Sequence, residues 1–263
     1  AEFAMRGRAY ATAISMVAAA LPLLGWLSTV IVALVCLRSG VAAGSLILLW
    51  TLLPVGVAFY FVGDPSPMIA LVGTFMMAML LRQTLSWELV LIGSVVFSAA
   101  GALIFEFSAA GILDRFVQFY IDYLAQVDAS VVIDPVQARK LLMGFFAVGQ
   151  AFSMVVMLMI ARWCQSTLYN LGGFRKEFHQ LRLSPAVSGS IVLAMAVCYM
   201  FGDQLGSWLP LLTVPLVFAS IGLAHWLTAN RELSKNWVVG FYGSLTLLFQ
   251  IVYPVLASLA LMD

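Results

Sequence analysis

Side chains that could catalyse a reaction or hold a metal are few in this sequence, and they form no recognisable set. The two histidines, His179 and His225, have no carboxylate or cysteine at the spacing that a metal site or an acid–base pair requires. The three cysteines lie in or beside apolar runs without a C-x-x-C motif, which is typical of small core residues. The sequence contains no P-loop, G-x-S-x-G or H-E-x-x-H motif. We therefore expect no catalytic residue, no metal and no cofactor, and a protein that is not an enzyme.

Uncharged polar side chains within apolar runs are better candidates, because they could bind a ligand without ionic chemistry. Gln150 and Gln250 lie inside such runs, and Tyr253 precedes Pro254, which interrupts the hydrogen-bond ladder of a helix. Broken helices often line a cavity in transporters. Trp50 stands one turn before another proline. We predict that Trp50, Gln150, Gln250 and Tyr253 contribute to a ligand site. The alternative is that the glutamines bond between helices and the proline only bends its helix.

A basic segment, residues 170–185, interrupts the apolar sequence, and we call it the connector. It reads N-L-G-G-F-R-K-E-F-H-Q-L-R-L-S-P. Its apolar residues fall at helical spacing, which predicts a short amphipathic helix. Two glycines would end the preceding helix, and Pro185 suits the first turn of the next one. The connector could bind anionic lipid headgroups or a protein partner, or serve only as a topological anchor. The residues expected at such a contact are Arg175, Lys176, Arg182, Phe174 and Phe178.

The composition places the chain among integral membrane proteins. Hydrophobic residues make up 63% and charged residues 10% of it, with a mean hydropathy of +1.04, against about 45–50% and about 25% in soluble domains. The apolar runs are about 20 residues long, which favours helices over membrane strands. We predict an all-α, polytopic transmembrane bundle that forms a single domain over residues 1–263. Residues 1–4 are typical of a cloning remnant before a native start at Met5. We expect membrane lipids, and no nucleic acid, as partners.

About eight spans are expected. The apolar runs cover residues 9–37, 41–62, 68–81, 87–107, 141–161, 186–202, 208–227 and 237–261. The first run is long and contains Pro22 and Gly25. We favour one kinked helix there, because about 28 residues are too few for two full crossings of about 30 Å. A short hairpin is the alternative, and it would place the N-terminus on the other side of the membrane.

Lysine and arginine residues orient the bundle. With the connector inside, eight of these residues fall inside and three outside, and Arg6 and Arg8 are left over. The positive-inside rule favours this bias. The first group is Arg38, Arg82, Arg162, Arg175, Lys176, Arg182, Arg231 and Lys235, and the second is Arg115, Arg139 and Lys140. We therefore expect residues 162–185 to face the cytoplasm.

Residues 111–131, between the fourth and fifth spans, carry a separate amphipathic pattern. Apolar side chains fall on one helical face and charged or amide side chains largely on the other. The apolar face comprises Ile112, Phe116, Phe119, Tyr123 and Val127. The pattern predicts a helix in the plane of the outer interface. It would be either a simple cover for the bundle or a gate over a cavity that faces outward.

The sequence of the connector also resembles the signature of a known protein family. Asn170-Leu171-Gly172-Gly173-Phe174, then Phe178 and Leu181-Arg182-Leu183, resemble the signature of the DUF2232 (YybS-like) family of uncharacterised bacterial membrane proteins. The turn Leu37-Arg38-Ser39-Gly40 is similar to that family as well. The family is distantly similar to the S components of energy-coupling-factor transporters and to MreD-type proteins. The resemblance implies a helical bundle in the bacterial inner membrane that binds a small molecule or a partner protein from the outer face.

Small residues four apart let membrane helices approach closely. S components present such residues on their first helix to the transporter scaffold, and Ala9 and Ala13 have that spacing here, as do Gly40 and Gly44. We expect these four residues in helix packing, either within the chain or against a partner. The expected span number exceeds the six of S components, which argues against simple docking onto an energy-coupling module.

Two functions follow from these features. The first is a non-enzymatic protein that binds or transports a small molecule or lipid in the bundle, and it predicts a cavity open to the outer side. The second is a scaffold similar to MreD-type proteins, which recruits a membrane or cytoplasmic protein through the connector. The scaffold predicts a filled bundle and a stable complex.

Overall fold

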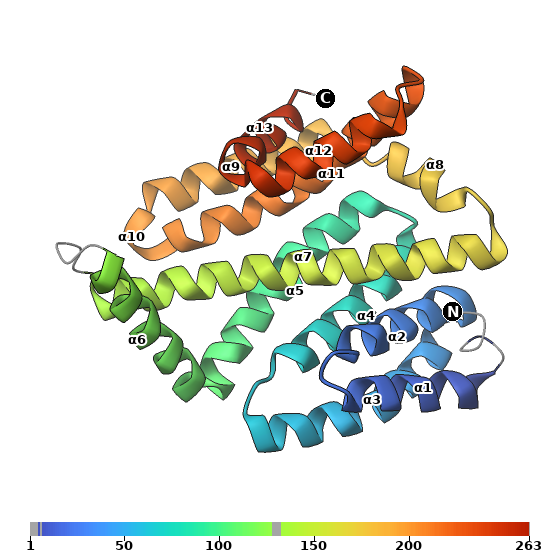
Figure 1. Cartoon of the computed structure of the whole chain (residues 1–263), viewed down its shortest axis with the longest axis horizontal. Coiled ribbons are helices and arrows are strands. Elements are labelled where there is room, and N and C mark those ends of the chain that lie inside the picture. Colours follow the sequence, from blue (N-terminus) through green and yellow to red (C-terminus); the bar gives the residue numbers. More distant parts are fainter. Residues whose placement is uncertain (1–4, 6, 128–132, 263) are drawn as a thin grey trace.

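The computed structural model describes residue 5, residues 7–127 and residues 133–262, and within these ranges every regular element is a helix (Figure 1). The predicted all-α fold is therefore confirmed. The elements are α1 (Arg8–Ala20), α2 (Gly25–Ser39), α3 (Val41–Val62), α4 (Ser66–Thr84), α5 (Trp87–Ser108), α6 (Ala110–Val127), α7 (Pro135–Tyr169), α8 (Gly173–His179), α9 (Pro185–Met200), α10 (Gly202–Leu205), η2 (Gly206–Trp208), α11 (Leu209–Asn230), α12 (Lys235–Leu247) and α13 (Phe249–Leu259).

The first apolar run is a hairpin, and its second helix forms the centre of one half of the bundle. A turn at residues 21–24 joins α1 to α2, and the two helices pack on each other and on α3 (Figure 1). Helix α2 also packs on α4 and α7, and its residues 28–37 are all buried. The favoured single kinked helix is therefore wrong. That expectation assumed that each helix must cross the bilayer, but α2 is enclosed by other helices and does not need that length.

The predicted apolar runs all form helices, but not all of these helices have the length of a span. Among the described residues, five segments are long and apolar enough to cross a membrane: α3, α4, α5, α7 and residues 202–230. A sixth is possible if α12 and α13 count as one broken span, because they meet at an angle of 116°. Helices α2 and α9 are shorter than the roughly 20 residues that a crossing requires. The chain is thus a multi-pass helical bundle with fewer full-length spans than the eight expected.

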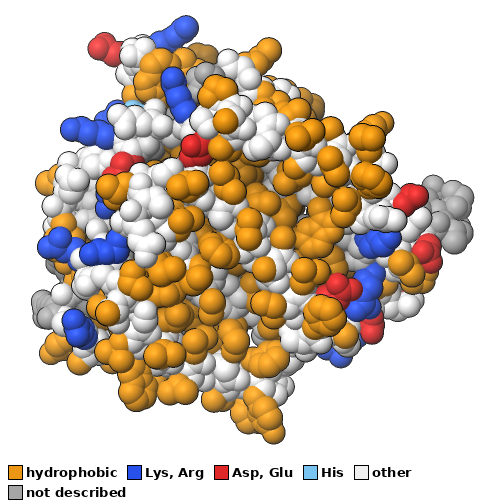
Figure 2. Space-filling view, turned by 180° about the vertical axis from the view of Figure 1, so that it is seen from behind, with side chains coloured by type: hydrophobic (Ala, Val, Ile, Leu, Met, Phe, Trp, Pro, Cys, Tyr) orange, Lys and Arg blue, Asp and Glu red, His pale blue; other side chains and the backbone are white. Residues whose placement is uncertain are grey.

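Charged side chains gather at two opposite ends of the bundle. At one end Arg139 of α7 pairs with Glu106 and Asp114, and at the other Arg162 of α7 pairs with Glu177. The two arginines are 23 positions apart on one helix, or about 35 Å at 1.5 Å per residue. Figure 2 shows a broad apolar surface between the charged margins. The separation is close to the roughly 30 Å thickness of the hydrocarbon core.

A chain of hydrogen bonds links the end of α2 to the connector. The Gln165 side chain of α7 donates from Nε2 to the carbonyl of Leu37 at 3.3 Å and accepts from Arg162. Arg162 in turn donates to both carboxylate oxygens of Glu177 in α8, with an Nε–Oε2 distance of 2.9 Å. The indole Nε1 of Trp87, in α5, also donates to Glu177, at 3.3 Å. Three helices, α5, α7 and α8, therefore meet at one carboxylate, and Gln165 links α2 to them.

The connector follows the expected outline. Tyr169 ends α7, Gly172 adopts a positive φ of 81°, and Pro185 lies in the first turn of α9. The seven-residue helix α8 lies close to α11 because Gly222 has no side chain there. A Cβ on Gly222 would lie 3.0 Å from the carbonyl oxygen of Phe178. The end of the bundle is thus closed by the connector rather than by a long loop.

Gly44 provides a direct test of the packing between α2 and α3. A Cβ at Gly44 would lie 2.9 Å from the backbone Cα of Cys36, whereas a Cβ at Gly149 of α7 would meet no atom within 4 Å. Because backbone cannot shift cheaply, we expect Gly44→Ala to lower the free energy of unfolding by about 1–3 kcal/mol. Gly149→Ala should be neutral or raise it by about 0.5–1 kcal/mol. Thermal unfolding in detergent measures both, and equal melting temperatures would contradict the packing.

Glu177→Ala tests the hydrogen-bond chain. The change removes the acceptor of Arg162 and Trp87, whose donors are partly buried. We expect a loss of about 1–3 kcal/mol, seen as faster hydrogen exchange over residues 173–183. The control is Lys176→Ala, one residue away with an exposed side chain. Unchanged protection of the connector in Glu177→Ala would show that this carboxylate does not hold α8.

Candidate functional site

A groove of about 910 Å³ lies between α5, α6 and α7, at the end of the bundle that carries Arg139, and we call it the α6 groove. Its wall is apolar and rich in phenylalanine. The apolar lining is Val62, Phe105, Ile112, Leu113, Phe116, Phe119, Leu142, Phe145 and Phe146. Three polar residues, Asp64, Ser66 and Arg115, complete it. Such a lining suits an apolar molecule with a small polar end.

Helix α6 is the predicted amphipathic helix, and residues 128–131 of the predicted segment lie outside the described residues. It packs mainly on α7, and its buried residues are Leu113 and Val117. Phe116 and Phe119 belong to the predicted apolar face and are 55% and 71% exposed. The helix therefore docks through a narrow stripe. Most of its apolar face is left for the groove and for the surface of the bundle.

Ionic contacts hold the first half of α6 in place. Arg139 donates from Nε to Glu106 of α5 at 3.2 Å and from Nη1 to Asp114 of α6 at 2.6 Å. Asp64 accepts a hydrogen bond from the backbone N–H of Ser66 at 2.9 Å, at the start of α4. Glu106 and Asp114 are thus bound by Arg139, whereas Asp64 lines the groove. The arrangement can bind and enclose a molecule, and it also places the Ser66 hydroxyl against the Asp64 carboxylate at the edge of the groove.

The four predicted ligand residues do not line the α6 groove. Trp50 lies on α3 and is 48% exposed, and Gln250 is exposed at the start of α13. The Oε1 atom of Gln150 is buried without a hydrogen-bond partner in the described structure. The hydroxyl of Tyr253 hydrogen-bonds with Thr213 of α11. The break near Tyr253 is at residue 248, between α12 and α13, whereas Pro254 lies inside α13.

The small residues predicted for packing divide into two groups. Ala9 and Ala13 are exposed on α1, whereas Ala11 and Ser15 on the other face are buried. Gly44 packs on α2, as described above. Gly40 has a φ of 103° and forms the turn between α2 and α3. Both faces of α1 thus carry small residues four apart, and the buried pair is Ala11 and Ser15.

The connector residues likewise point in different directions. Phe174 and Phe178 stack at 5.7 Å between ring centroids, and Phe174 also lies 6.1 Å from Trp87. Both phenylalanines therefore pack against other aromatic side chains of the same protein. Arg175 and Lys176 are exposed. The guanidinium of Arg182 lies 5.4 Å from the ring centre of Trp226.

Comparison with known protein families, with curated proteins and with solved structures finds no match to this chain. Membership of the DUF2232 family therefore remains a prediction from the connector residues.

Sequence reasoning identified Phe116 and Phe119 on the apolar face of α6 but missed the phenylalanines that α5 and α7 contribute to the α6 groove. The neighbouring pair Phe145 and Phe146, one turn into the apolar part of α7, is the strongest signal, and Phe105 stacks on Phe146 at 4.3 Å. In a membrane protein, however, a phenylalanine that faces lipid has the same sequence context as one that lines a groove. Only the packing of α5, α6 and α7 distinguishes the two.

Arg139→Ala tests the attachment of α6. The change removes both ionic contacts, which are partly exposed and together worth about 1 kcal/mol. We expect hydrogen exchange over residues 110–127 to rise about fivefold, with little change in α4. Gln137→Ala, an exposed neighbour on the same helix, is the control and should leave exchange unchanged. Equal exchange in both variants would mean that packing alone holds α6.

Proposed function

We propose that the protein is a non-enzymatic membrane protein that binds an apolar or weakly polar small molecule, or a lipid, in the α6 groove. The observation that carries this proposal is the phenylalanine-lined groove of about 910 Å³ beside an amphipathic helix. Its volume falls in the range of ligand pockets, about 300–1,000 Å³. The expected role is that of a substrate-binding subunit of a transporter, with the ligand delivered to a partner that supplies the energy.

The proposed location is the bacterial inner membrane, with the connector in the cytoplasm and the α6 groove on the outer side. The distribution of lysine and arginine supports this orientation. So does the grouping of charges, because Arg38, Arg82 and Arg162 lie near the connector, whereas Arg139 lies at the opposite end. The resemblance to the DUF2232 family supports the bacterial origin.

Helix α6 is the proposed gate of the groove. It buries few residues and is fixed to α5 and α7 chiefly by Arg139 and a narrow apolar stripe. Segments with little buried surface open at low free-energy cost. Movement of α6 would widen the groove and disturb α2 and the connector little, since α6 packs on α7 and α5.

The scaffold is the second candidate, and the exposed face of α1 favours it. Ala9 and Ala13 offer a flat surface on which another membrane helix could pack. The connector offers a partner its exposed charges, Arg175 and Lys176, but its phenylalanines are already packed within the chain. A partner would therefore bind by charge at the connector and by close packing at α1.

Native mass spectrometry of the protein extracted gently from its own membrane tests the proposed function. We expect an adduct of defined mass on the wild-type chain. Phe116→Ser removes a phenylalanine that lines the groove and should weaken binding at least tenfold, since burying such a side chain contributes about 1.5–3 kcal/mol. Phe107→Ser, a change at an 86% exposed phenylalanine of α5, should retain the adduct.

Two outcomes would contradict the proposal. The first is an adduct that survives Phe116→Ser as well as it survives Phe107→Ser, which would place the ligand elsewhere. The second is a wild-type chain with an empty groove and a stoichiometric protein partner, which would favour the scaffold. Equal melting temperatures of the two variants would show that lost binding does not reflect unfolding.

A further inference from the structure

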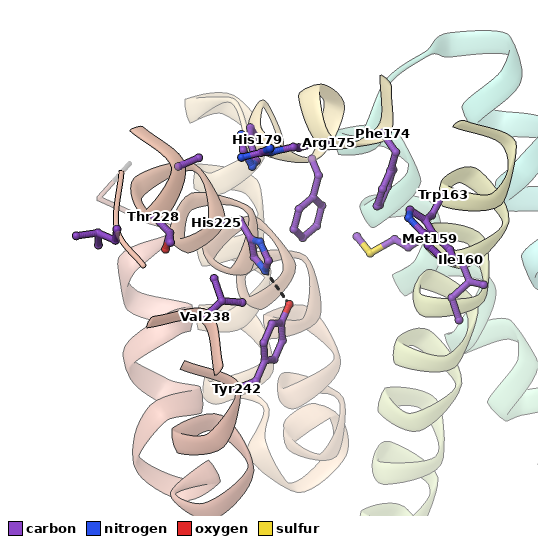
Figure 3. A pocket seen from close by; sticks show the side chains of 13 residues that line it. Met159, Ile160, Trp163, Phe174, Arg175, His179, His225, Thr228, Val238 and Tyr242 are labelled. Atoms are coloured by element: carbon purple, nitrogen blue, oxygen red, sulfur yellow. Dashed lines mark hydrogen bonds between the residues drawn. The ribbon is translucent and has the colours of Figure 1, made fainter. Parts of the chain in front are cut away.

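A second pocket, at the opposite end of the bundle, lies beneath the connector, and we call it the connector pocket. It has a volume of about 600 Å³ and is open rather than enclosed. Figure 3 shows its two walls, one from α7 with Met159, Ile160 and Trp163, and the other from α11 and α12 with His225 and Tyr242. Helix α8 covers its end. Most of the lining is apolar or aromatic, so the pocket has the character of a binding site for hydrocarbon along much of its length.

The charge of the connector pocket is positive. No aspartate or glutamate is among its lining residues, whereas Arg175 and His179 are. The one acid of α8, Glu177, is bound by Arg162 and Trp87 instead. Within the described ranges no carboxylate pairs with Arg175. Burial, and then the charge of Arg175, lower the pKa of His179. At neutral pH its ring is therefore neutral, and Arg175 supplies the charge of the lining.

The lining is not uniform along the pocket, because its cation lies at one end. In Figure 3, Arg175 and His179 lie at the connector end, whereas His225 and Tyr242 lie further toward the middle of the bundle. A hydrogen bond of 2.9 Å joins the side chains of His225 and Tyr242 and links α11 to α12. Trp163 is 57% exposed, and tryptophan is favoured at the depth of lipid headgroups.

We infer that the connector pocket binds one anionic phospholipid from the membrane leaflet on the connector side. The phosphate would lie against Arg175, and the first part of an acyl chain would lie along Trp163 and Tyr242. The apolar walls favour a lipid over a soluble anion, which would leave them exposed to water. The absence of a carboxylate from the lining favours an anionic headgroup over a zwitterionic one, whose ammonium group would have no acidic partner. This site is independent of the α6 groove, which lies at the other end of α7.

Native mass spectrometry with added lipid tests the inference on the full chain. The probes are dioleoyl phosphatidylglycerol, dioleoyl phosphatidylcholine and inorganic phosphate, each titrated into the purified protein in micelles. We expect one phosphatidylglycerol to bind more tightly than phosphatidylcholine, and phosphate not to displace it. Arg175→Ala should weaken phosphatidylglycerol binding at least fivefold, the effect of about one basic residue at an anionic membrane surface. Arg175→Lys should retain most of the affinity.

Lys176→Ala is the matched control, because it removes the same charge from the next residue of α8 without touching the pocket. It should change the affinity by less than about twofold, since an exposed charge is screened by salt. A second variant, Val238→Trp, fills the pocket from α12 and should abolish the preference for phosphatidylglycerol while Arg175 is intact. The melting temperature of each variant shows whether it is folded.

Several results would overturn the inference. Equal affinity for the two lipids would show that the headgroup charge does not determine binding. Displacement by phosphate would mean that the site binds a soluble anion. Equal losses in Arg175→Ala and Lys176→Ala would mean diffuse attraction to the basic surface. Wild-type affinity in Val238→Trp would place the lipid outside the pocket. Because Phe116 is at the opposite end, Phe116→Ser should leave phosphatidylglycerol binding unchanged. Failure of this site and failure of the α6 groove are thus distinguishable.

Discussion

The carbonyl groups at the end of α2 need hydrogen-bond donors, and the connector end of the bundle supplies them. Helix ends leave carbonyls without intrahelical partners, and a membrane interior supplies no water to satisfy them. Here Arg82 and Gln165 donate to the carbonyl of the buried Leu37. Gln165 is held by Arg162, and Arg162 by Glu177. This chain of hydrogen bonds ties the position of α8, and with it the roof of the connector pocket, to Leu37, the last buried residue of α2.

Helix α7 unites the two candidate sites. Its N-terminal half contributes Phe145 and Phe146 to the α6 groove, and its C-terminal half contributes Met159 and Trp163 to the connector pocket. Between them the helix is packed on α2, α4, α5 and α11. The two proposed sites, one at each end of this helix, differ in their lining. The α6 groove is aromatic with one cation and one carboxylate, and the connector pocket is aromatic with a cation and no carboxylate among its described lining residues.

The sequence predicts features that depend on the local pattern of residues. It does not predict features that depend on which distant residues pack against each other. Composition and the length of apolar runs are sufficient for the helical membrane class, and the periodicity of residues 111–131 is sufficient for α6. The hairpin of α1 and α2 could not be predicted from length, because α2 is enclosed by neighbours from distant parts of the chain. The proposed ligand site likewise depends on phenylalanines from three helices. The polar side chains within single apolar runs instead predicted a ligand site at Trp50 and Gln150, which lie outside the α6 groove.

The unequal lengths of the helices have a consequence for the surrounding lipid. The apolar part of α7, about 35 Å between its two arginines, exceeds a hydrocarbon core of about 30 Å, and a tilt of about 30° would reconcile the two. Helix α9, with 16 residues and several exposed apolar side chains, is about 24 Å long and falls short of the same core. The bilayer beside α9 would thin while that beside α7 would not. The protein would therefore impose a thickness gradient around its circumference, and this hydrophobic mismatch would bias which side a neighbouring membrane protein approaches.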